Sequence, residues 1–225
     1  MEGTVAKRTD DRGLVVHGEA ETWMDAGGEE HPHSPRGKRA VEIQALWHAA
    51  LESAAGIAEA AGDRALAEQW ERRAAAVREV FAAAYWDEGR GALHDHLNPD
   101  GTPDAKARPN QILAATVPWS PLLDPEREGR MIEFVERTCV LPHGVASLAP
   151  DDPQFHPRHL DLDRYHFDEA YHNGDVWVWL TGPVVSALVK RGRVAEAWRQ
   201  TAVLSEMFYA EGAAGTLPED RKSVV

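Results

Sequence analysis

Paired amphipathic segments joined by a tight glycine turn constrain the fold of this chain more than any other feature of its sequence. Apolar residues recur at helical spacing over residues 41–61 and again over 64–84, where charged residues fill the opposite face. Gly62 between the two segments ends the first helix, and Asp63 is a suitable cap for the second. We therefore predict two helices that pack back on each other as a hairpin.

The same arrangement returns near the end of the chain. Helical spacing extends over residues 175–190 and 194–210, with the short turn 191–193 between them. Two shorter helices are predicted at 110–117, which ends before a proline, and at 124–138, which an aspartate and a proline begin. Together these segments predict an all-α fold built from helical hairpins.

Long polar loops separate the predicted helices. Residues 85–103 break into turn sequences around 92–97, a stretch that alternates loosely and predicts a small β-hairpin. Residues 144–168 form a second irregular excursion that contains prolines, histidines and aspartates. Loops of this length in a compact domain usually carry function or are disordered. The sequence has no glycine-rich phosphate loop and no alternation of strands and helices, so it does not indicate a nucleotide-binding α/β fold.

Charge and composition narrow the classes of partner and compartment. The chain has 225 residues, enough to bury a substantial core, and we expect one domain. A formal net charge of -13 disfavours nucleic acid and anionic lipid as partners. No apolar run is long enough to span a membrane, residues 1–13 lack the core of a secretory signal, and the lone Cys139 excludes an intrachain disulfide. We therefore expect a soluble protein of the reducing cytoplasm.

Tryptophan is unusually frequent in this sequence. Eight tryptophans stand against five phenylalanines and four tyrosines. An indole offers a flat apolar face and an N–H donor, which suits the rings and hydroxyls of sugars. The alternative is that the tryptophans only fill gaps between helices. One of them, Trp23, precedes Asp25, and an indole beside a carboxyl group can raise its pKa and make it a general acid; the alternative for Asp25 is a turn or cap residue.

Four segments resemble, in the same order along the chain, those of a known enzyme family. They read Thr-Trp-Met-Asp at 22–25, Pro-Arg and then Val-Glu-Ile-Gln-Ala-Leu-Trp within 35–47, Arg-Pro-Asn-Gln at 108–111, and Tyr-His-Asn-Gly-Asp-Val-Trp-Val-Trp-Leu at 171–180. Together they resemble the C-terminal glucosidase domain of glycogen debranching enzymes, a family of (α/α)6-barrel glycosidases. This resemblance implies an incomplete (α/α)6 barrel, a toroid of helical hairpins with long loops.

The resemblance assigns two catalytic carboxyl groups. Asp25 falls on the general acid of the family, and Glu219, in Gly-Thr-Leu-Pro-Glu at 215–219, falls on its general base. The family inverts the configuration of the anomeric carbon, so the two carboxyl groups should stand about 6.5–9.5 Å apart with a water molecule between the base and the sugar. The alternative for Glu219 is a solvated glutamate in a loose tail.

The resemblance also implies a glucose-binding pocket around these carboxyl groups. Arg, Asn and Gln side chains can hold sugar hydroxyls, and indoles can stack on the sugar ring. The implied pocket residues are Trp23, Arg36, Glu42, Trp47, Arg108, Asn110, Gln111, His172, Asn173, Trp177 and Trp179. Structural roles stay open for some of them: Arg36 and Glu42 could pair with each other as a clamp, and His172 could be a buried core histidine.

Histidines in the loops raise the question of a metal centre. Examples are His31 with His33, His94 with His96, and the pair at 156 and 159. Their spacings match no recognised set of zinc ligands, and loops collect histidine freely. The resemblance implies no metal and no other cofactor, so we expect none.

The resemblance further implies that the chain is truncated at both ends. The family's domain begins with several helices before the Thr-Trp-Met-Asp loop and continues beyond the Leu-Pro-Glu segment, so residues 1–225 should form a single partial domain. We interpret residues 220–225 as a non-native tail, because Asp-Arg-Lys-Ser-Val-Val is the translation of a common sequencing adapter in one frame.

The function that the resemblance predicts is that of an amylo-alpha-1,6-glucosidase. Such an enzyme hydrolyses terminal α-1,6-linked glucose at the branch points of glycogen or another branched α-glucan. Two alternatives stay open: another α-glucosidase or trehalase-like hydrolase with the same barrel, and a non-catalytic helical carbohydrate-binding fragment. A common cleft for Asp25 and Glu219 would distinguish the enzymes from the non-catalytic fragment.

Overall fold

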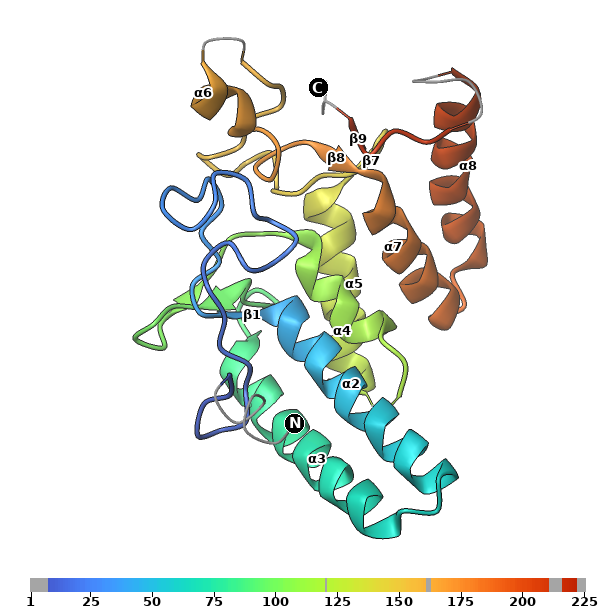
Figure 1. Cartoon of the computed structure of the whole chain (residues 1–225). Coiled ribbons are helices and arrows are strands. Elements are labelled where there is room, and N and C mark those ends of the chain that lie inside the picture. Colours follow the sequence, from blue (N-terminus) through green and yellow to red (C-terminus); the bar gives the residue numbers. More distant parts are fainter. Residues whose placement is uncertain (1–7, 120, 161–162, 211–215, 222–225) are drawn as a thin grey trace.

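Helical hairpins dominate the architecture, as the sequence predicts. The computed structural model of the chain describes residues 8–119, 121–160, 163–210 and 216–221. Its longer helices run side by side, whereas the long loops and short strands gather toward one end of them (Figure 1). Of the residues described, no helix combines the length and the apolar character needed to cross a membrane.

The first hairpin consists of α2 (Val41–Ala60) and α3 (Arg64–Tyr85), which pack together along their length (Figure 1). Gly62 makes the turn with φ of 79°, a backbone conformation that glycine adopts without strain. Asp63 then caps α3, because its carboxylate accepts a hydrogen bond from the backbone N–H of Leu66 at 3.0 Å. The predicted hairpin and its cap are both confirmed.

The second hairpin consists of α7 (Val178–Lys190) and α8 (Val194–Ala210), with Gly192 at φ of 74° in the turn. The sequence predicts the start of this hairpin three residues too early. Val176 and Trp177 are extended instead and form strand β8 (Val176–Trp177), which pairs with β9 (Asp220–Arg221). Residues 176–177 are therefore extended because they pair with another strand, although their apolar spacing would also suit a helix.

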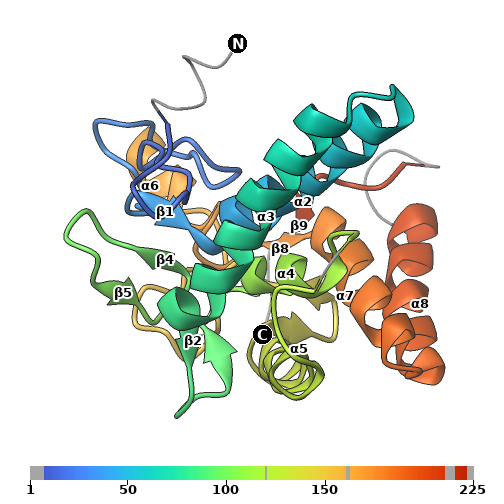
Figure 2. The same cartoon turned by 90° about the horizontal axis from the view of Figure 1, so that it is seen from below.

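Shorter helices lie between the hairpins. The predicted helix at 110–117 is divided into the 3-10 turn η1 (Pro109–Ile112) and α4 (Leu113–Thr116), and α4 contacts both α2 and α7 (Figure 2). Helix α5 (Pro125–Cys139) begins as predicted, because Asp124 accepts hydrogen bonds from the backbone N–H groups of residues 126 and 127. A further short helix, α6 (Arg164–Asp168), interrupts the long excursion at 144–168.

In the part of the chain that the structure describes, four small sheets tie the loops together. The small β-hairpin predicted around 92–97 is present, but as two hairpins. β3 (Ala92–Leu93) pairs with β2 (Trp86–Asp87) across the turn at 88–91. β4 (His96–Leu97) pairs with β5 (Pro103–Asp104) across the turn at 98–102, and on its other side with β1 (Arg39–Ala40). The other pairs are β6 (Val140–Leu141) with β7 (Gly144–Val145), and β8 with β9. Because β1 runs directly into α2, pairing with β4 fixes where that helix begins.

One hydrophobic core joins these elements. It includes Leu14 before the first helix, Phe81 on α3, Met131 on α5 and Leu180 on α7, none of which is exposed to solvent. Of the aromatic side chains at the loop end, Trp177 belongs to this core and others pack against it. The core therefore holds the loop end of the helices as one body, on which the candidate site is built.

Candidate active site

The loop that carries Asp25 is anchored on both sides of that residue. Before it, the indole N–H of Trp23 donates to Oδ1 of Asn110 at 2.8 Å, and Met24 is completely buried. After it, the backbone N–H of Ala26 donates to Nδ1 of His172 at 3.4 Å. The side chain of Asp25 itself is exposed to solvent. The loop therefore presents the predicted acid outward while its neighbours hold the backbone in place.

Aromatic side chains form a cluster around Trp23. Its ring meets those of His172, Trp177 and Trp179 edge to face, with centroid distances of 5.2, 5.2 and 5.1 Å. Trp177 is 5% exposed and donates its indole N–H to the carbonyl of Tyr171 at 2.8 Å, so it supports the cluster from beneath. Trp179 is 40% exposed. Trp179 and the half-buried Trp23 thus have indole surface left for a ligand.

Glu219 reaches the same region from the opposite end of the sequence. Its backbone carbonyl accepts a hydrogen bond from the N–H of Val178 at 3.5 Å, and the next residue pairs with Trp177 in the β8–β9 ladder. The Glu219 side chain is exposed. Because Trp177 packs on Trp23 on one side and pairs with the Glu219 segment on the other, the segment 176–178 links both predicted catalytic segments. Of the predicted tail at 220–225, Asp220 and Arg221 form β9, and residues 222–225 lie outside the described residues.

A buried ion cluster lies beneath the acid loop. The guanidinium of Arg36 donates to both carboxylate oxygens of Glu42 at 2.8 and 2.9 Å and to both of Asp95 at 2.9 and 3.1 Å. All three side chains are at most 2% exposed. This geometry supports the clamp that the sequence left open for Arg36 and Glu42, since neither side chain has surface to offer a sugar.

The ion cluster also sets the protonation of its members. Burial alone would raise the pKa of Asp95, but Arg36, His96 and Arg108 together hold that pKa well below its usual range. Burial and the neighbouring carboxylate act the other way on Glu42, whose pKa is raised despite its pairing with Arg36. Two carboxylates thus share one arginine, and their pKa values are displaced in opposite directions.

A second arginine ties three loops together. Arg108 donates to the backbone carbonyls of Ser147 and His172 at 3.0 and 2.6 Å, and to Oδ1 of Asn173 at 2.7 Å. The same Asn173 oxygen accepts from the hydroxyl of Ser34 at 2.9 Å, and its amide nitrogen donates to the carbonyl of His33. Arg108 and Asn173, which are both buried, therefore tie residues 33–34 to the loops at 147 and 172–173.

Gln111 has a similar structural role. Its side-chain oxygen accepts from the backbone N–H of Leu93 at 2.9 Å and its amide donates to the carbonyl of Arg108 at 3.1 Å. His172 is also buried, and burial followed by the positive charges of Arg108 and Arg36 lowers its pKa to about 3. A neutral imidazole that accepts at Nδ1 carries its proton on Nε2. The ring is thus buried, as the core alternative requires, but its Nε2 atom has no hydrogen-bond partner among the residues that the structure describes.

Comparison with known proteins identifies the family. The sequence matches the family described as amylo-alpha-1,6-glucosidase over residues 1–220. The chain belongs to this family of glycoside hydrolases. The glycogen debranching enzyme of Saccharomyces cerevisiae is 26% identical over 211 residues, which cover 75% of this chain and 14% of the yeast protein. The chain therefore spans only a small part of that relative's length.

Solved structures of glycosidases share the fold at low sequence identity. One described as a sialidase has a TM-score of 0.74 at 16% identity and covers 100% of this chain and 21% of its own. The GH63 mannosylglycerate hydrolase from Thermus thermophilus, in complex with glucose, has a TM-score of 0.58 at 18% identity. That match covers 79% of this chain and 44% of the hydrolase. The neutral trehalase of Saccharomyces cerevisiae has a TM-score of 0.62 at 14% identity, and the match covers 83% of this chain and 34% of the trehalase. The predicted all-α, (α/α)6-type fold is confirmed.

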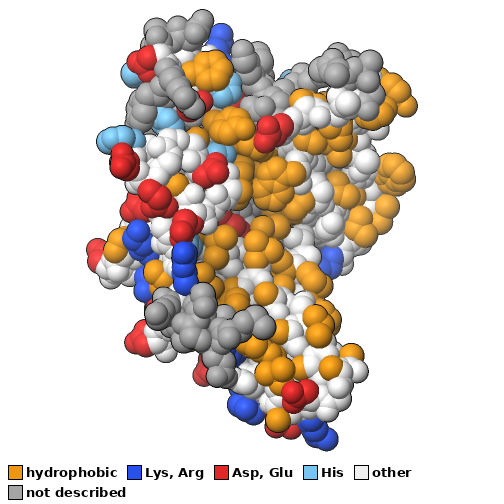
Figure 3. Space-filling model, viewed as in Figure 1, with side chains coloured by type: hydrophobic (Ala, Val, Ile, Leu, Met, Phe, Trp, Pro, Cys, Tyr) orange, Lys and Arg blue, Asp and Glu red, His pale blue; other side chains and the backbone are white. Residues whose placement is uncertain are grey.

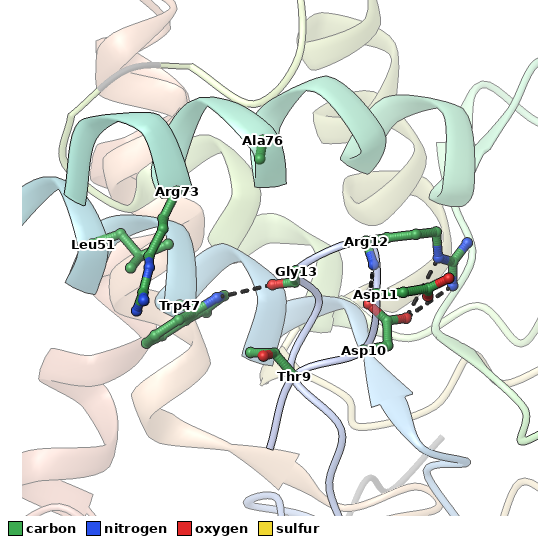
Figure 4. A pocket seen from close by; sticks show the side chains of 9 residues that line it. All are labelled: Thr9, Asp10, Asp11, Arg12, Gly13, Trp47, Leu51, Arg73 and Ala76. Atoms are coloured by element: carbon green, nitrogen blue, oxygen red, sulfur yellow. Dashed lines mark hydrogen bonds and ion pairs between the residues drawn. The ribbon is translucent and has the colours of Figure 1, made fainter. Parts of the chain in front are cut away.

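One predicted pocket residue of this glucosidase-family chain lies elsewhere. Trp47 donates its indole N–H to the carbonyl of Gly13 at 3.1 Å and borders a cavity of about 480 Å³ between the N-terminal segment and the helices α2 and α3 (Figure 4). Arg73 and Leu51 lie on the same wall. No residue of the Trp23 cluster borders this cavity, so the structure does not bring Trp47 together with the aromatic cluster.

A group of possible metal ligands has its oxygens already occupied. Asp95, His96 and Asp104 place ligand atoms within 4.8 Å of one another. Arg36 and Asn110 take the oxygens of Asp95, however, and Lys106 holds Asp104 at 2.9 Å, so positive charge is already supplied by protein groups. Asp95 is the residue that sequence reasoning missed. The run His94-Asp95-His96 could have indicated it, but its histidines suggest only a metal motif when the sequence is read alone.

Proposed function

We propose that this chain carries the catalytic surface of an amylo-alpha-1,6-glucosidase that hydrolyses terminal α-1,6-linked glucose of glycogen or a related branched α-glucan. Asp25 protonates the departing glycosidic oxygen, and Glu219 activates the water that attacks the anomeric carbon from the other face. The single observation that supports this most is the segment 177–178: Trp177 contacts Trp23 of the Asp25 loop, and the next residue donates its backbone N–H to the carbonyl of Glu219.

Substrate recognition follows from the surfaces that the cluster leaves open. We propose that Trp23 and Trp179 stack on the C–H faces of the terminal glucose, because both indoles keep free surface beside the acid loop. The buried residues Arg36, Arg108 and His172 then hold the loops and do not touch the sugar. A neutral glucan also suits a chain of net charge -13, which offers anionic polymers little attraction.

We also propose that the residues act as one domain in a reducing, cytoplasmic compartment. One core joins elements from Leu14 to Ala197, which supports a single unit. Cys139 is buried and free, and burial raises the pKa of its thiol to about 12, which keeps it unreactive. Retention of the thiol after purification without reductant would agree with this; a disulfide-linked form would not.

The test is glucose release from phosphorylase limit dextrin. The protein would be expressed with whatever its gene encodes on either side of residues 1–225, as wild type, Asp25→Asn and Glu219→Gln. Each substitution should lower kcat by about 10²- to 10⁴-fold, because it removes one proton-transfer group. Matched controls are Asp11→Asn and Glu206→Gln, which change exposed carboxylates on the N-terminal segment and on α8 and should leave kcat unchanged.

Two other outcomes would replace this proposal. Undiminished release by Asp25→Asn would remove that residue from the mechanism. Release of glucose from trehalose but not from limit dextrin would favour the trehalase-like alternative, whose fold the chain shares. Binding of limit dextrin by the wild type without any glucose release would favour the non-catalytic carbohydrate-binding alternative.

A further inference from the structure

The buried carboxylate of Asp95 has a second set of contacts beyond the ion cluster. Its Oδ1 accepts a hydrogen bond from the side-chain amide of Asn110 at 2.9 Å, and Asn110 in turn accepts from the indole of Trp23. We propose that Asp95 is a positioning residue that orients the Asn110 amide and, through it, the indole plane of Trp23. This inference rests on the proposed function, in which Trp23 stacks on the sugar.

The orientation follows from the donors and acceptors available. An ionised carboxylate only accepts hydrogen bonds, and an indole N–H only donates. The Asn110 amide lies between one of each, so its NH2 group must face Asp95 and its oxygen must face Trp23. The reversed amide would place two donors against each other on one side and two acceptors on the other, in a site without solvent.

The ion cluster fixes the position of Asp95 itself. Arg36 donates from Nε to Oδ2 and from Nη2 to Oδ1, which holds the carboxylate in one plane, and Glu42 holds the far side of the guanidinium. The Nδ1 atom of His96 lies 3.0 Å from Oδ2. The lone pair of Oδ1 that faces Asn110 therefore has a defined direction. The buried ion cluster is thereby linked to the indole of Trp23 through Asn110, although no member of the cluster contacts the proposed sugar itself.

The far end of this relay is the candidate sugar platform. Trp23 meets the exposed Trp179 edge to face at 86°, and Asp25 follows two residues later in the same loop. Loss of the hydrogen bond to Asn110 would let the indole turn about its side-chain bonds and change that angle. The expected consequence is weaker sugar binding with a smaller effect on proton transfer, because Trp23 exchanges no proton.

Nuclear magnetic resonance of indole-15N-labelled protein tests the relay without reference to activity. Assignment by Trp23→Phe identifies the Trp23 indole N–H. In Asp95→Asn this signal should shift. The exchange of the indole proton with solvent should accelerate by about tenfold, because a change of that size corresponds to the loss of one to two neutral hydrogen bonds. The Trp47 indole, bonded to the Gly13 carbonyl and away from the aromatic cluster, is the internal reference and should not change.

The matched control is Asp104→Asn, the same substitution on the neighbouring strand β5. Asp104 pairs with Lys106 and makes no contact with Asn110, so the Trp23 signal should stay at its wild-type position. A folded Asp95→Asn variant whose Trp23 signal is also unmoved would overturn the inference. An equal shift in both variants would do the same, because it would reveal a general loosening of the sheet.

Asp95→Asn removes a buried charge and is at risk of not folding. The wild-type protein then decides the question, through the side-chain amide protons of Asn110. Slow solvent exchange of these protons, with no short contact to the Trp23 indole proton, is expected when the NH2 group faces Asp95. Fast exchange, or amide protons adjacent to the indole proton, would contradict the orientation.

Kinetics on limit dextrin supply the functional part of the test. In Asp95→Asn we expect KM to rise by about tenfold while kcat changes less, and we expect neither to change in Asp104→Asn. A fall in kcat with KM unchanged would contradict a positioning role toward the sugar platform. If the wild type releases no glucose, the proposed function fails, whereas the resonance of Trp23 still decides whether Asp95 orients it.

Discussion

At the scale of single residues, the candidate site contains two kinds of side chain: some face solvent, and others are buried and hold the loops in place. Asp25, Trp179 and Glu219 are exposed, whereas Arg36 and His172 are fully buried. Motifs in the sequence indicated all five as candidates but not this division, because a polar residue in a motif reads the same whether it binds a ligand or a loop. Burial and hydrogen-bond partners show which of them face solvent.

His172 makes stability depend on pH. Burial lowers its pKa to about 3 from an ordinary value of 6.5, so the folded chain keeps the ring neutral while the unfolded chain protonates it below pH 6.5. Stability is therefore lost as pH falls through that window, by about 2 kcal/mol between pH 7 and pH 5 from this residue.

Urea denaturation at the two pH values measures this loss. His172→Gln keeps an acceptor for Ala26 but does not titrate, so its loss between pH 7 and pH 5 should be smaller by about 2 kcal/mol. Substitution of the exposed His143 by glutamine is the control and should leave the pH dependence as in the wild type. An equal loss in His172→Gln and wild type would show that His172 is not the titrating group.

At the scale of elements, the helical hairpins were predictable and the short strands were not. The turn at 62–63 and the cap at Asp124 are local signals, so α2, α3 and α5 begin close to the predicted positions. Strands of two residues depend on partners far along the chain, as β4 depends on β1 and β8 on β9. No periodicity exists in so short a stretch, and the division of 92–97 between two sheets could not be read from it.

Gly174 tests the connecting loop at this scale. A Cβ atom there would lie 2.1 Å from the backbone carbonyl oxygen of His156. The backbone of His156 is held in place, because its N–H donates to the carbonyl of Asn173 at 2.7 Å. Gly174→Ala should therefore destabilise the chain by about 1–3 kcal/mol and weaken sugar binding, since this loop carries His172 and leads to Trp177.

The matched control is Gly182→Ala on α7, where an added Cβ meets nothing within 4 Å. Alanine in a helix interior should stabilise the chain by about 0.5–1 kcal/mol. Thermal unfolding followed by circular dichroism compares the two variants. A Gly174→Ala variant as stable as the wild type would mean that the loop has room to shift and does not hold the site rigidly.

At the scale of the whole molecule, an apolar surface extends over the outer helices. Figure 3 shows hydrophobic side chains gathered over much of one face. Exposed apolar side chains of the helices include Ile57 on α2 at 70%, Trp198 on α8 at 69% and Val189 on α7 at 52%. Surfaces of this kind usually contact other protein. The formal charge of -13 opposes association of two copies, most strongly at low salt.

The 225-residue chain by itself should consequently self-associate as salt is raised. Sedimentation at rising protein concentration in about 0.5 M salt should show a growing sedimentation coefficient, because charge repulsion is screened at that ionic strength. Trp198→Lys should shift association to higher concentration, whereas Arg199→Lys beside it, which keeps the charge, should not. A wild-type chain that stays monomeric under these conditions would show that the apolar surface is not adhesive.

The central claim is that Asp25 and Glu219 act across one cleft with a water molecule beside the base. Inversion of an α-linked glucose then releases β-glucose first. Proton NMR of the anomeric signals during hydrolysis of limit dextrin, recorded before mutarotation, measures this directly. The account predicts that β-glucose appears first and α-glucose grows in later. Initial release of α-glucose would contradict it, because retention requires a carboxylate that attacks the sugar itself.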